Sequence, residues 1–251
     1  MRVVVLGASS GLGRCTAIGL GGAGHDVALL ARRKERLDAA VEEIGERAVG
    51  IECDVTDEAG CHEAVATAAD HLGGIDALVY ATGVGRIGRL SEMDAATWTH
   101  ILATNVVGAA IATQAALPHL QASDGRAIYF SSVSASMTPA WPGLGAYISS
   151  KAALDKLVEA WRIEHPEVGF TRLIVGDCGG GEGDSAIGFT EGWDMELATE
   201  FGRTWYEKGY IAGALLDVDD LVAAIDGIIR LGSSAVVPSM AVLPRVPRPA
   251  G

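Results

Sequence analysis

The sequence has few cysteines, few histidines and no long apolar segment, and each shortage argues against a class of protein. Its four cysteines (Cys15, Cys53, Cys61 and Cys178) are scattered without a C-x-x-C pair, so we expect no disulfide framework and a reducing, cytoplasmic location. None of its six histidines has a partner at metal-ligand spacing, so we expect no metal site. No apolar run approaches the roughly 20 residues that cross a bilayer. Because the first strand begins within two residues of the N-terminus, we expect no signal peptide and a soluble protein.

Basic residues are also scarce relative to acidic ones. The formal net charge of −13 argues against nucleic acid or an anionic membrane as a partner. Against this background, Arg32, Arg33, Lys34 and Arg36 form a local basic cluster. The length of 251 residues suits one α/β domain, and no linker divides the chain. We therefore expect residues 1–251 to form one domain.

The first 31 residues have the pattern of a strand, a glycine turn, a helix and a second strand. Val3 to Leu6 form a short apolar run with β-branched bias, typical of a buried parallel strand. The glycine turn that follows has the spacing G-x-x-x-G-x-G, and the residues expected to contact a ligand there are Gly7, Ser9, Ser10, Gly11, Leu12 and Gly13. Free N–H groups and the positive end of the helix dipole favour an anion at such a turn, usually a pyrophosphate. The alternative is a βα turn without a ligand.

The remaining pattern alternates strands with helices. We expect strands at residues 3–6, 27–30, 48–52, 76–81, 127–130, 170–175 and 235–237. Helices are expected at 14–23, 33–45, from a Thr56 N-cap to about 71, 94–120 with an end near Pro118, 145–164 and 217–231. Strands separated by single helices imply right-handed crossovers and a parallel sheet. The fold class is therefore α/β, a doubly wound (Rossmann-type) sheet of about seven strands with helices on both faces. Ligands bind at the carboxyl ends of such strands.

The basic cluster bears on the choice of cofactor. Its charges lie at the N-terminal end of a helix, where the helix dipole disfavours cations. A 2′-phosphate on the adenosine ribose would compensate, because that ribose lies at the end of the second strand. An acid at this place would favour NAD, whereas the chain has Ala31 and then Arg32. We expect NADP, with NAD as the less favoured choice; the alternative is a solvated helix start in which Glu35 pairs with the cations.

A candidate catalytic pair, Tyr147 and Lys151, lies near the start of the helix at 145–164. Residues four apart share a helix face. A phenol with a pKa of about 10 needs a nearby cation to act as an acid at neutral pH, and Lys151 could supply it. Ser132, at the end of the neighbouring strand, could hold a substrate carbonyl against Tyr147. Taken alone, Tyr-x-x-x-Lys is weak evidence because it occurs by chance in many helices.

The order of these motifs resembles the short-chain dehydrogenase/reductase family. The segments that carry the resemblance are Gly7-Ala-Ser-Ser-Gly-Leu-Gly13, Asp54-Val55, Asn105-Val-Val-Gly108, Ser131-Ser132-Val133 and Tyr147-Ile-Ser-Ser-Lys151, and it covers roughly residues 1–175. The resemblance implies hydride transfer between a nicotinamide and a carbonyl or alcohol. It also implies a homodimer or homotetramer.

The resemblance also implies a role for each site residue. Tyr147 would be the general acid or base, and Lys151 would lower the pKa of Tyr147 and hold the nicotinamide ribose. Ser132 would orient the substrate oxygen, and Asn105 would anchor a water in a proton relay. Cofactor contacts would come from the glycine turn, Arg32 and Arg33 of the basic cluster, Asp54, Val55, Ala81 and Gly83, together with Tyr147 and Lys151.

Three departures from the family pattern stand out. Tyr80-Ala81-Thr82-Gly83 replaces the usual Asn-Asn-Ala-Gly. The interval from Ser132 to Tyr147 is longer than usual, which makes Ser134 an alternative to Ser132. Gly176 to Asp184 replaces the usual Pro-Gly after the sixth strand, and this segment is either a mobile lid or a slack loop.

The region after that segment is rich in aromatic residues. They are Phe189, Trp193, Phe201, Trp205, Tyr206 and Tyr210. We expect residues 176–210 to form a lid and a substrate-pocket segment, although packing or a subunit interface would also explain the aromatics. Residues 244–251, with Pro244, Pro247 and Pro249, are expected to be a flexible tail.

These expectations define a function and its alternatives. We expect an NADP-dependent oxidoreductase that acts on a neutral, fairly apolar ketone, aldehyde or secondary alcohol, with this small molecule as its partner. The first alternative is a non-catalytic dinucleotide-binding sensor of the same fold. The second is a lyase or epimerase that uses the same cofactor.

Overall fold

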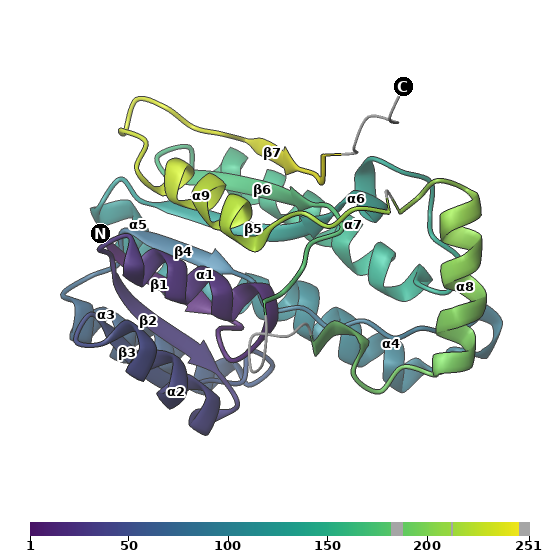
Figure 1. Ribbon diagram of the computed structural model, residues 1–251. Coiled ribbons are helices and arrows are strands. Elements are labelled where there is room, and N and C mark those ends of the chain that lie inside the picture. Colours follow the sequence, from purple (N-terminus) through teal and green to yellow (C-terminus); the bar gives the residue numbers. More distant parts are fainter. Residues whose placement is uncertain (182–187, 212, 246–251) are drawn as a thin grey trace.

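A parallel β-sheet forms the centre of the computed structural model, which describes residues 1–181, 188–211 and 213–245 (Figure 1). Its strands are β1 (Arg2–Leu6), β2 (Asp26–Ala31), β3 (Ala48–Glu52), β4 (Ala77–Tyr80), β5 (Arg126–Ser132), β6 (Gly169–Val175) and β7 (Ser239–Val242). Their order is β3-β2-β1-β4-β5-β6-β7, and every pairing is parallel. The order reverses between β1 and β4, so the predicted doubly wound sheet is confirmed.

Helices cover both faces of this sheet. One face carries α1 (Gly11–Gly22), α2 (Lys34–Ile44) and α9 (Val218–Ile229), and the other carries α3 (Glu58–Leu72), α5 (Gly108–Ala122) and α7 (Gly145–Glu164). Strand β1 shows why both faces need cover: Val4 and Leu6 belong to one buried cluster, whereas Val3 and Val5 belong to the other. Successive side chains on a strand point to opposite faces, so an all-apolar strand is stable only between two layers.

A third apolar cluster lies beyond the carboxyl ends of the strands. It joins α6 (Val133–Ser136), the start of α7 and helix α8 (Met195–Glu207) through residues that include Val133, Trp141 and Trp205. Figure 1 shows α8 standing to one side of the sheet. Arg89 contacts α8 twice, because its guanidinium pairs with Glu200 at 2.7 Å and lies 5.4 Å from the centre of the Phe201 ring. The short helix η1 (Leu90–Glu92) follows Arg89.

The long helix expected at 94–120 is interrupted and ends later than predicted. It comprises α4 (Ala95–Leu102), the π-helical segment η2 (Ala103–Val107) and α5, which continues past Pro118 to Ala122. Proline removes one intrahelical hydrogen bond, but Pro118 and Gln114 are both exposed, so water can satisfy the released carbonyl. By length and composition this stretch could cross a membrane, yet its apolar residues Ile111, Ala112 and Leu120 lie in the core.

Three local expectations need correction. Helix α3 is capped by Asp57, whose carboxylate accepts from Gly60 N–H, and not by Thr56. Strand β5 includes Ser132, because β6 pairs with it along its whole length. The last strand is Ser239–Val242 and not 235–237. Pro238 explains this shift, because proline has no N–H to donate to a neighbouring strand. Its carbonyl oxygen accepts a hydrogen bond from Arg172 N–H, and the strand begins at the next residue.

Candidate active site

A cleft of about 980 Å³ runs along the carboxyl ends of the strands. Every expected site residue lines it except Asn105, which is completely buried behind the wall. The topology explains this arrangement, because the turns after β1, β2, β3, β4 and β5 all open at the same edge of the sheet. The cleft therefore brings together motifs that are up to about half the chain apart.

The glycine turn forms the floor of the cleft between β1 and α1. Gly7 has φ +85°, and a Cβ there would lie 2.8 Å from Thr82 N; a Cβ on Gly13 would lie 2.4 Å from Gly7 O. Larger residues at either position would push the turn away from β4. Helix α1 begins at Gly11 with no acidic residue in its first turn and no side-chain cap from Ser10. Its first N–H groups thus have no acidic side chain of the first turn and no Ser10 cap beside them, an arrangement that fits the phosphates of a dinucleotide.

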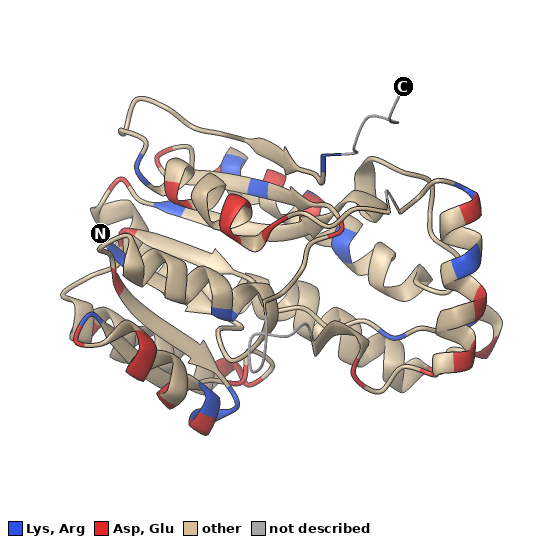
Figure 2. Ribbon diagram, viewed as in Figure 1, with Lys and Arg blue, Asp and Glu red and all other residues tan. Residues whose placement is uncertain are grey.

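Arg33 contacts two serines of the glycine turn. Its Nη2 donates to Ser10 Oγ at 2.6 Å and to Ser9 Oγ at 3.1 Å. Figure 2 shows the basic residues gathered where β2 passes into α2, next to the glycine turn. Arg32 is exposed at the same end of the cleft. Both arginines line this end of the cleft, and the predicted helix start is confirmed with Arg33 as its N-cap.

Asp54 and Val55 follow β3 and line the same end. Thr56 donates to Asp54 Oδ1 from its N–H at 2.9 Å and its hydroxyl at 2.7 Å. Burial alone would raise the pKa of Asp54, but the Thr56 hydrogen bonds and the charge of Arg32 hold it below its ordinary value. The carboxylate is therefore a fixed hydrogen-bond acceptor at the end of the cleft that Arg32 also lines. Ala81 and Gly83, which follow β4, also line the cleft.

Tyr147 lies in the cleft wall, half-buried, near the start of α7. Burial of its hydroxyl raises the pKa of Tyr147 to about 12, and a hydrogen bond with the Ser132 hydroxyl opposes that increase. Ser132 Oγ also lies 2.9 Å from Ser134 Oγ and accepts from Ser134 N–H at 3.2 Å. Both serines line the cleft, and Ser132 is the one that acts on Tyr147.

Lys151 lies one helical turn further along α7 and is 3% exposed. Its Nζ donates to Phe130 O at 2.7 Å and lies 5.8 Å from the centre of the Tyr147 ring. Burial lowers the pKa of Lys151 to about 8, and the charge of Asp155 opposes that decrease. The amine thus lies between strand β5 and the tyrosine. Its pKa of about 8 means that it loses its charge only slightly above neutral pH.

Asn105 holds the wall in place from the π-helical segment. Its Nδ2 donates to Val84 O at 2.9 Å and to Ser150 Oγ at 2.8 Å, and its Oδ1 accepts from Val84 N–H at 2.8 Å. The side chain therefore connects the segment after β4 to α7. Tyr80, one of the departures from the family pattern, supports the same place, because its hydroxyl donates to Thr104 O at 2.5 Å. The water-anchoring role of Asn105 stays a prediction.

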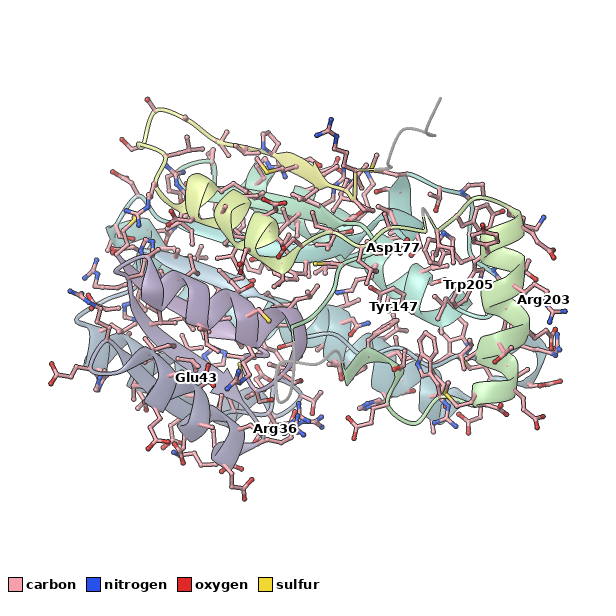
Figure 3. All side chains as sticks on the ribbon, viewed as in Figure 1. Arg36, Glu43, Tyr147, Asp177, Arg203 and Trp205 are labelled. Carbon is pink, nitrogen blue, oxygen red and sulfur yellow. The ribbon has the colours of Figure 1, made fainter. Side chains whose placement is uncertain are left out.

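Aromatic rings form the other end of the cleft. Phe189, in the short helix η4 (Gly188–Thr190), packs edge-on against Tyr147 with centroids 4.8 Å apart, and Trp193 packs against Phe189 at 5.1 Å. The ring centroids of Trp141 and Trp205 lie 5.4 Å apart. Figure 3 shows Trp205 directed from α8 toward the side of the molecule that holds Tyr147, whereas Arg203 points away.

The indole N–H groups of this region are already satisfied by the protein. Trp141 donates to Thr138 Oγ1, Trp193 to Gly85 O and Trp205 to Pro142 O. The rings therefore present apolar faces to the cleft. The charged lining residues described there are the cations Arg32, Arg33 and Lys151 and the acids Asp54, Asp177 and Glu191. Both arginines lie at the end of the cleft that Asp54 lines, whereas Lys151 lies beside Tyr147, on which the Phe189 ring packs.

Sequence reasoning missed part of this wall. Trp141 and Leu144 lie in the loop that lengthens the interval from Ser132 to Tyr147, and both face the cleft. The extra length of this loop indicated an additional structural feature near the site. A single sequence does not show, however, where such a loop packs. Of the predicted lid at 176–184, residues 182–184 lie outside the described residues, as do 246–251 of the predicted tail. Among the described residues, no group of three or more His, Cys, Asp and Glu side chains could hold a metal ion.

Comparison with known proteins agrees with this geometry. The family model described as short chain dehydrogenase matches residues 1–179. An 11-beta-hydroxysteroid dehydrogenase 1A of Arabidopsis thaliana is 36% identical over 167 residues, which cover 64% of this chain and 47% of that protein. The chain thus spans about half the length of this curated relative.

Solved structures share the whole fold. The closed form of a serine dehydrogenase complexed with NADP+ matches with a TM-score of 0.83 at 24% identity, over 100% of this chain and 98% of the other. An alcohol dehydrogenase from the archaeon Thermococcus sibiricus, complexed with 5-hydroxy-NADP, matches with a TM-score of 0.80 at 24% identity, over 99% and 98%. At 24% identity, the similarity to these two structures establishes the fold alone.

Proposed function

Because the chain belongs to the short-chain dehydrogenase family, we propose that it is an NADP-dependent oxidoreductase that transfers a hydride between the nicotinamide and a neutral, apolar carbonyl or secondary alcohol. The observation that carries this proposal is the placement of Tyr147, Lys151 and Ser132 on the wall of the cleft whose floor is the glycine turn. The bound cofactor would supply the hydride, and the protein would supply orientation and a proton. The chain would act in the cytoplasm as a homodimer or homotetramer, without nucleic acid or membrane as partner.

The residues present fit the cofactor. The turn at Gly7 to Gly13 would hold the pyrophosphate, and the Asp54–Val55 segment would meet the adenine. Arg33, with Arg32, would bind a 2′-phosphate, because its guanidinium already donates to both serines of the turn. Structural neighbours named as NADP complexes support the same choice. Lys151 and the Ala81–Gly83 wall would hold the nicotinamide end.

In the direction of reduction, Ser132 would donate a hydrogen bond to the substrate carbonyl oxygen and hold it beside Tyr147. Tyr147 would then give its proton to that oxygen. The Lys151 ammonium would stabilise the phenolate that this transfer leaves. Oxidation of the alcohol would run the same steps in reverse.

The aromatic end of the cleft supports a neutral, apolar substrate. Its indole N–H groups are used by the protein, and the acids Asp177 and Glu191 would repel a carboxylate. Such a pocket binds an apolar body and leaves the carbonyl as the polar group to be recognised.

Fluorescence titration with NADPH and NADH, followed by a panel of carbonyl compounds, tests the proposal. We expect tighter binding of NADPH and turnover of neutral ketones. Binding of neither dinucleotide would refute it. Binding without turnover of any carbonyl or alcohol would favour the sensor, and lyase or epimerase turnover that leaves the cofactor unchanged would favour the second alternative.

A further inference from the structure

A buried acid, Asp155, lies on α7 one helical turn beyond Lys151. The two residues are four positions apart and therefore share the helix face that packs on the sheet. Lys151 is 3% exposed and Asp155 is 8% exposed. A buried ammonium is costly unless an opposite charge lies nearby. Phe130 O accepts from Lys151 Nζ, but a carbonyl supplies only a partial charge, so the carboxylate is the full opposite charge within reach of this face.

Asp155 is itself held from the neighbouring strands. Arg172 on β6 donates from Nη1 to Asp155 Oδ2 at 3.3 Å, and the same guanidinium donates to Ser239 on β7. Burial raises the pKa of Asp155 above its ordinary value, although the Ser131 hydroxyl and the charges of Arg172 and Lys151 oppose that increase. The carboxylate thus lies between two cations, one at the active site and one on the far side.

The far side has access to solvent. Asp155 lines a hollow of about 240 Å³ together with Glu159, Arg162, Arg172, Pro238 and Ser239. None of these residues lines the cleft. Arg172 in this hollow can keep the carboxylate ionised while Lys151 remains buried on the active-site side.

We propose that Asp155 is a positioning residue of the active site, whose carboxylate keeps the Lys151 ammonium charged and held against β5 beside Tyr147. The proposal rests on the proposed function, because only the reaction requires Lys151 to be charged. The charged and titratable groups that face the pair are Tyr147 and Glu159 on α7, Arg162 in its last turns and Arg172 on β6. Strand β5 contributes only the hydroxyls of Ser131 and Ser132, and the π-helical segment η2 contributes the amide of Asn105.

Two substitutions break the same ion pair but should shift Lys151 in opposite directions. Asp155→Asn removes a negative charge and leaves Arg172 without its counter-charge, so the pKa of Lys151 should fall. Arg172→Gln removes the competing cation, so the pKa of Lys151 should rise. A purely structural role for the Asp155–Arg172 pair would give both variants the same kind of defect.

The test is an NMR titration of protein labelled with ¹³C at lysine Cε. The lysines are Lys34, Lys151, Lys156 and Lys208, so assignment needs only single substitutions. We expect the Lys151 midpoint to fall by about one pH unit in Asp155→Asn and to rise in Arg172→Gln. The matched control Glu159→Gln, one turn further along α7 and more exposed, should move it by less than about 0.3 unit.

Activity provides the second readout. The rate of carbonyl reduction should fall as the pH rises and Lys151 loses its proton. The pH at which it falls should shift with the Lys151 midpoint in each variant. An unchanged midpoint in Asp155→Asn, or shifts of the same sign in both variants, would overturn the inference. If Asp155→Asn fails to fold, the direction in Arg172→Gln decides. Opposite midpoint shifts without any carbonyl turnover would contradict the proposed function and leave the charge relation between Asp155 and Lys151 intact.

Discussion

The Nζ atom of Lys151 lies 5.8 Å from the centre of the Tyr147 ring and donates a hydrogen bond of 2.7 Å to Phe130 O. The amine is therefore held by strand β5 while it faces the tyrosine. In this structure the group that lowers the pKa of Tyr147 is the Ser132 hydroxyl, and burial outweighs it. The predicted lowering by Lys151 depends on the charge of this amine, which makes pH a direct probe of the site.

Carbonyl reduction should decrease as the pH rises through about 8. Burial lowers the pKa of Lys151 to about 8, so the ammonium is present below this pH and is lost above it. Tyr147, with a pKa of about 12, keeps its proton throughout this range. The measurement is kcat/KM for a neutral ketone from about pH 6 to about pH 10. A profile that stays flat over this range would show that the charge of Lys151 is not needed.

Arg33→Met should weaken NADPH binding by roughly 10- to 100-fold, the effect of losing a charge-assisted hydrogen bond to phosphate. NADH, which has no 2′-phosphate, should lose much less. Fluorescence titration of both dinucleotides measures the difference. The control is Arg36→Met in the same basic cluster, because Arg36 does not line the cleft. Equal losses for NADPH and NADH would indicate that Arg33 only supports the glycine turn.

Gly13→Ala should destabilise the fold by about 1–3 kcal/mol, because the new Cβ would lie 2.4 Å from Gly7 O. The matched control is Gly227→Ala in α9, where a Cβ meets nothing within 4 Å. That substitution should stabilise the protein by roughly 0.5–1 kcal/mol. Chemical denaturation measures both. A neutral Gly13→Ala variant with unchanged cofactor binding would mean that the turn can move away from β4.

Phe189→Ala should lower kcat/KM for a bulky apolar ketone by roughly 10-fold, while a small ketone should be affected less. The reason is the direct packing of Phe189 on Tyr147, which closes the aromatic end of the cleft. Tyr206→Ala is the control, since Tyr206 is 68% exposed on α8. Wild-type preference for a keto acid over the matched neutral ketone would contradict the substrate class.

The fold was predictable because its signals are local. The apolar run at Val3–Leu6 reflects a buried strand, whereas the strand at 48–52 and the helix at 145–164 are only partly buried, and the structure places all three where the sequence does. Errors arose where a distant partner decides the boundary. Strand β5 extends through Ser132 because β6 pairs with it, and β7 starts after Pro238.

The site was predictable as far as its motifs lie at the ends of strands. The parallel topology alone brings the glycine turn, Asp54 and Ser132 to one edge. Trp141 and Asp155 were not predictable in their roles, because each depends on packing against a segment far away in sequence. For Asp155 that segment is Arg172 on β6, and no local pattern specifies the pair.

Comparison of Tyr147→Phe with the wild type tests the central claim most directly. Phenylalanine keeps the ring that packs on Phe189 and removes only the hydroxyl. The account predicts that NADPH affinity stays within about threefold, whereas kcat for ketone reduction falls by roughly 10²- to 10⁴-fold, the contribution of a positioned general acid. Turnover at the wild-type rate with NADPH still bound would contradict it.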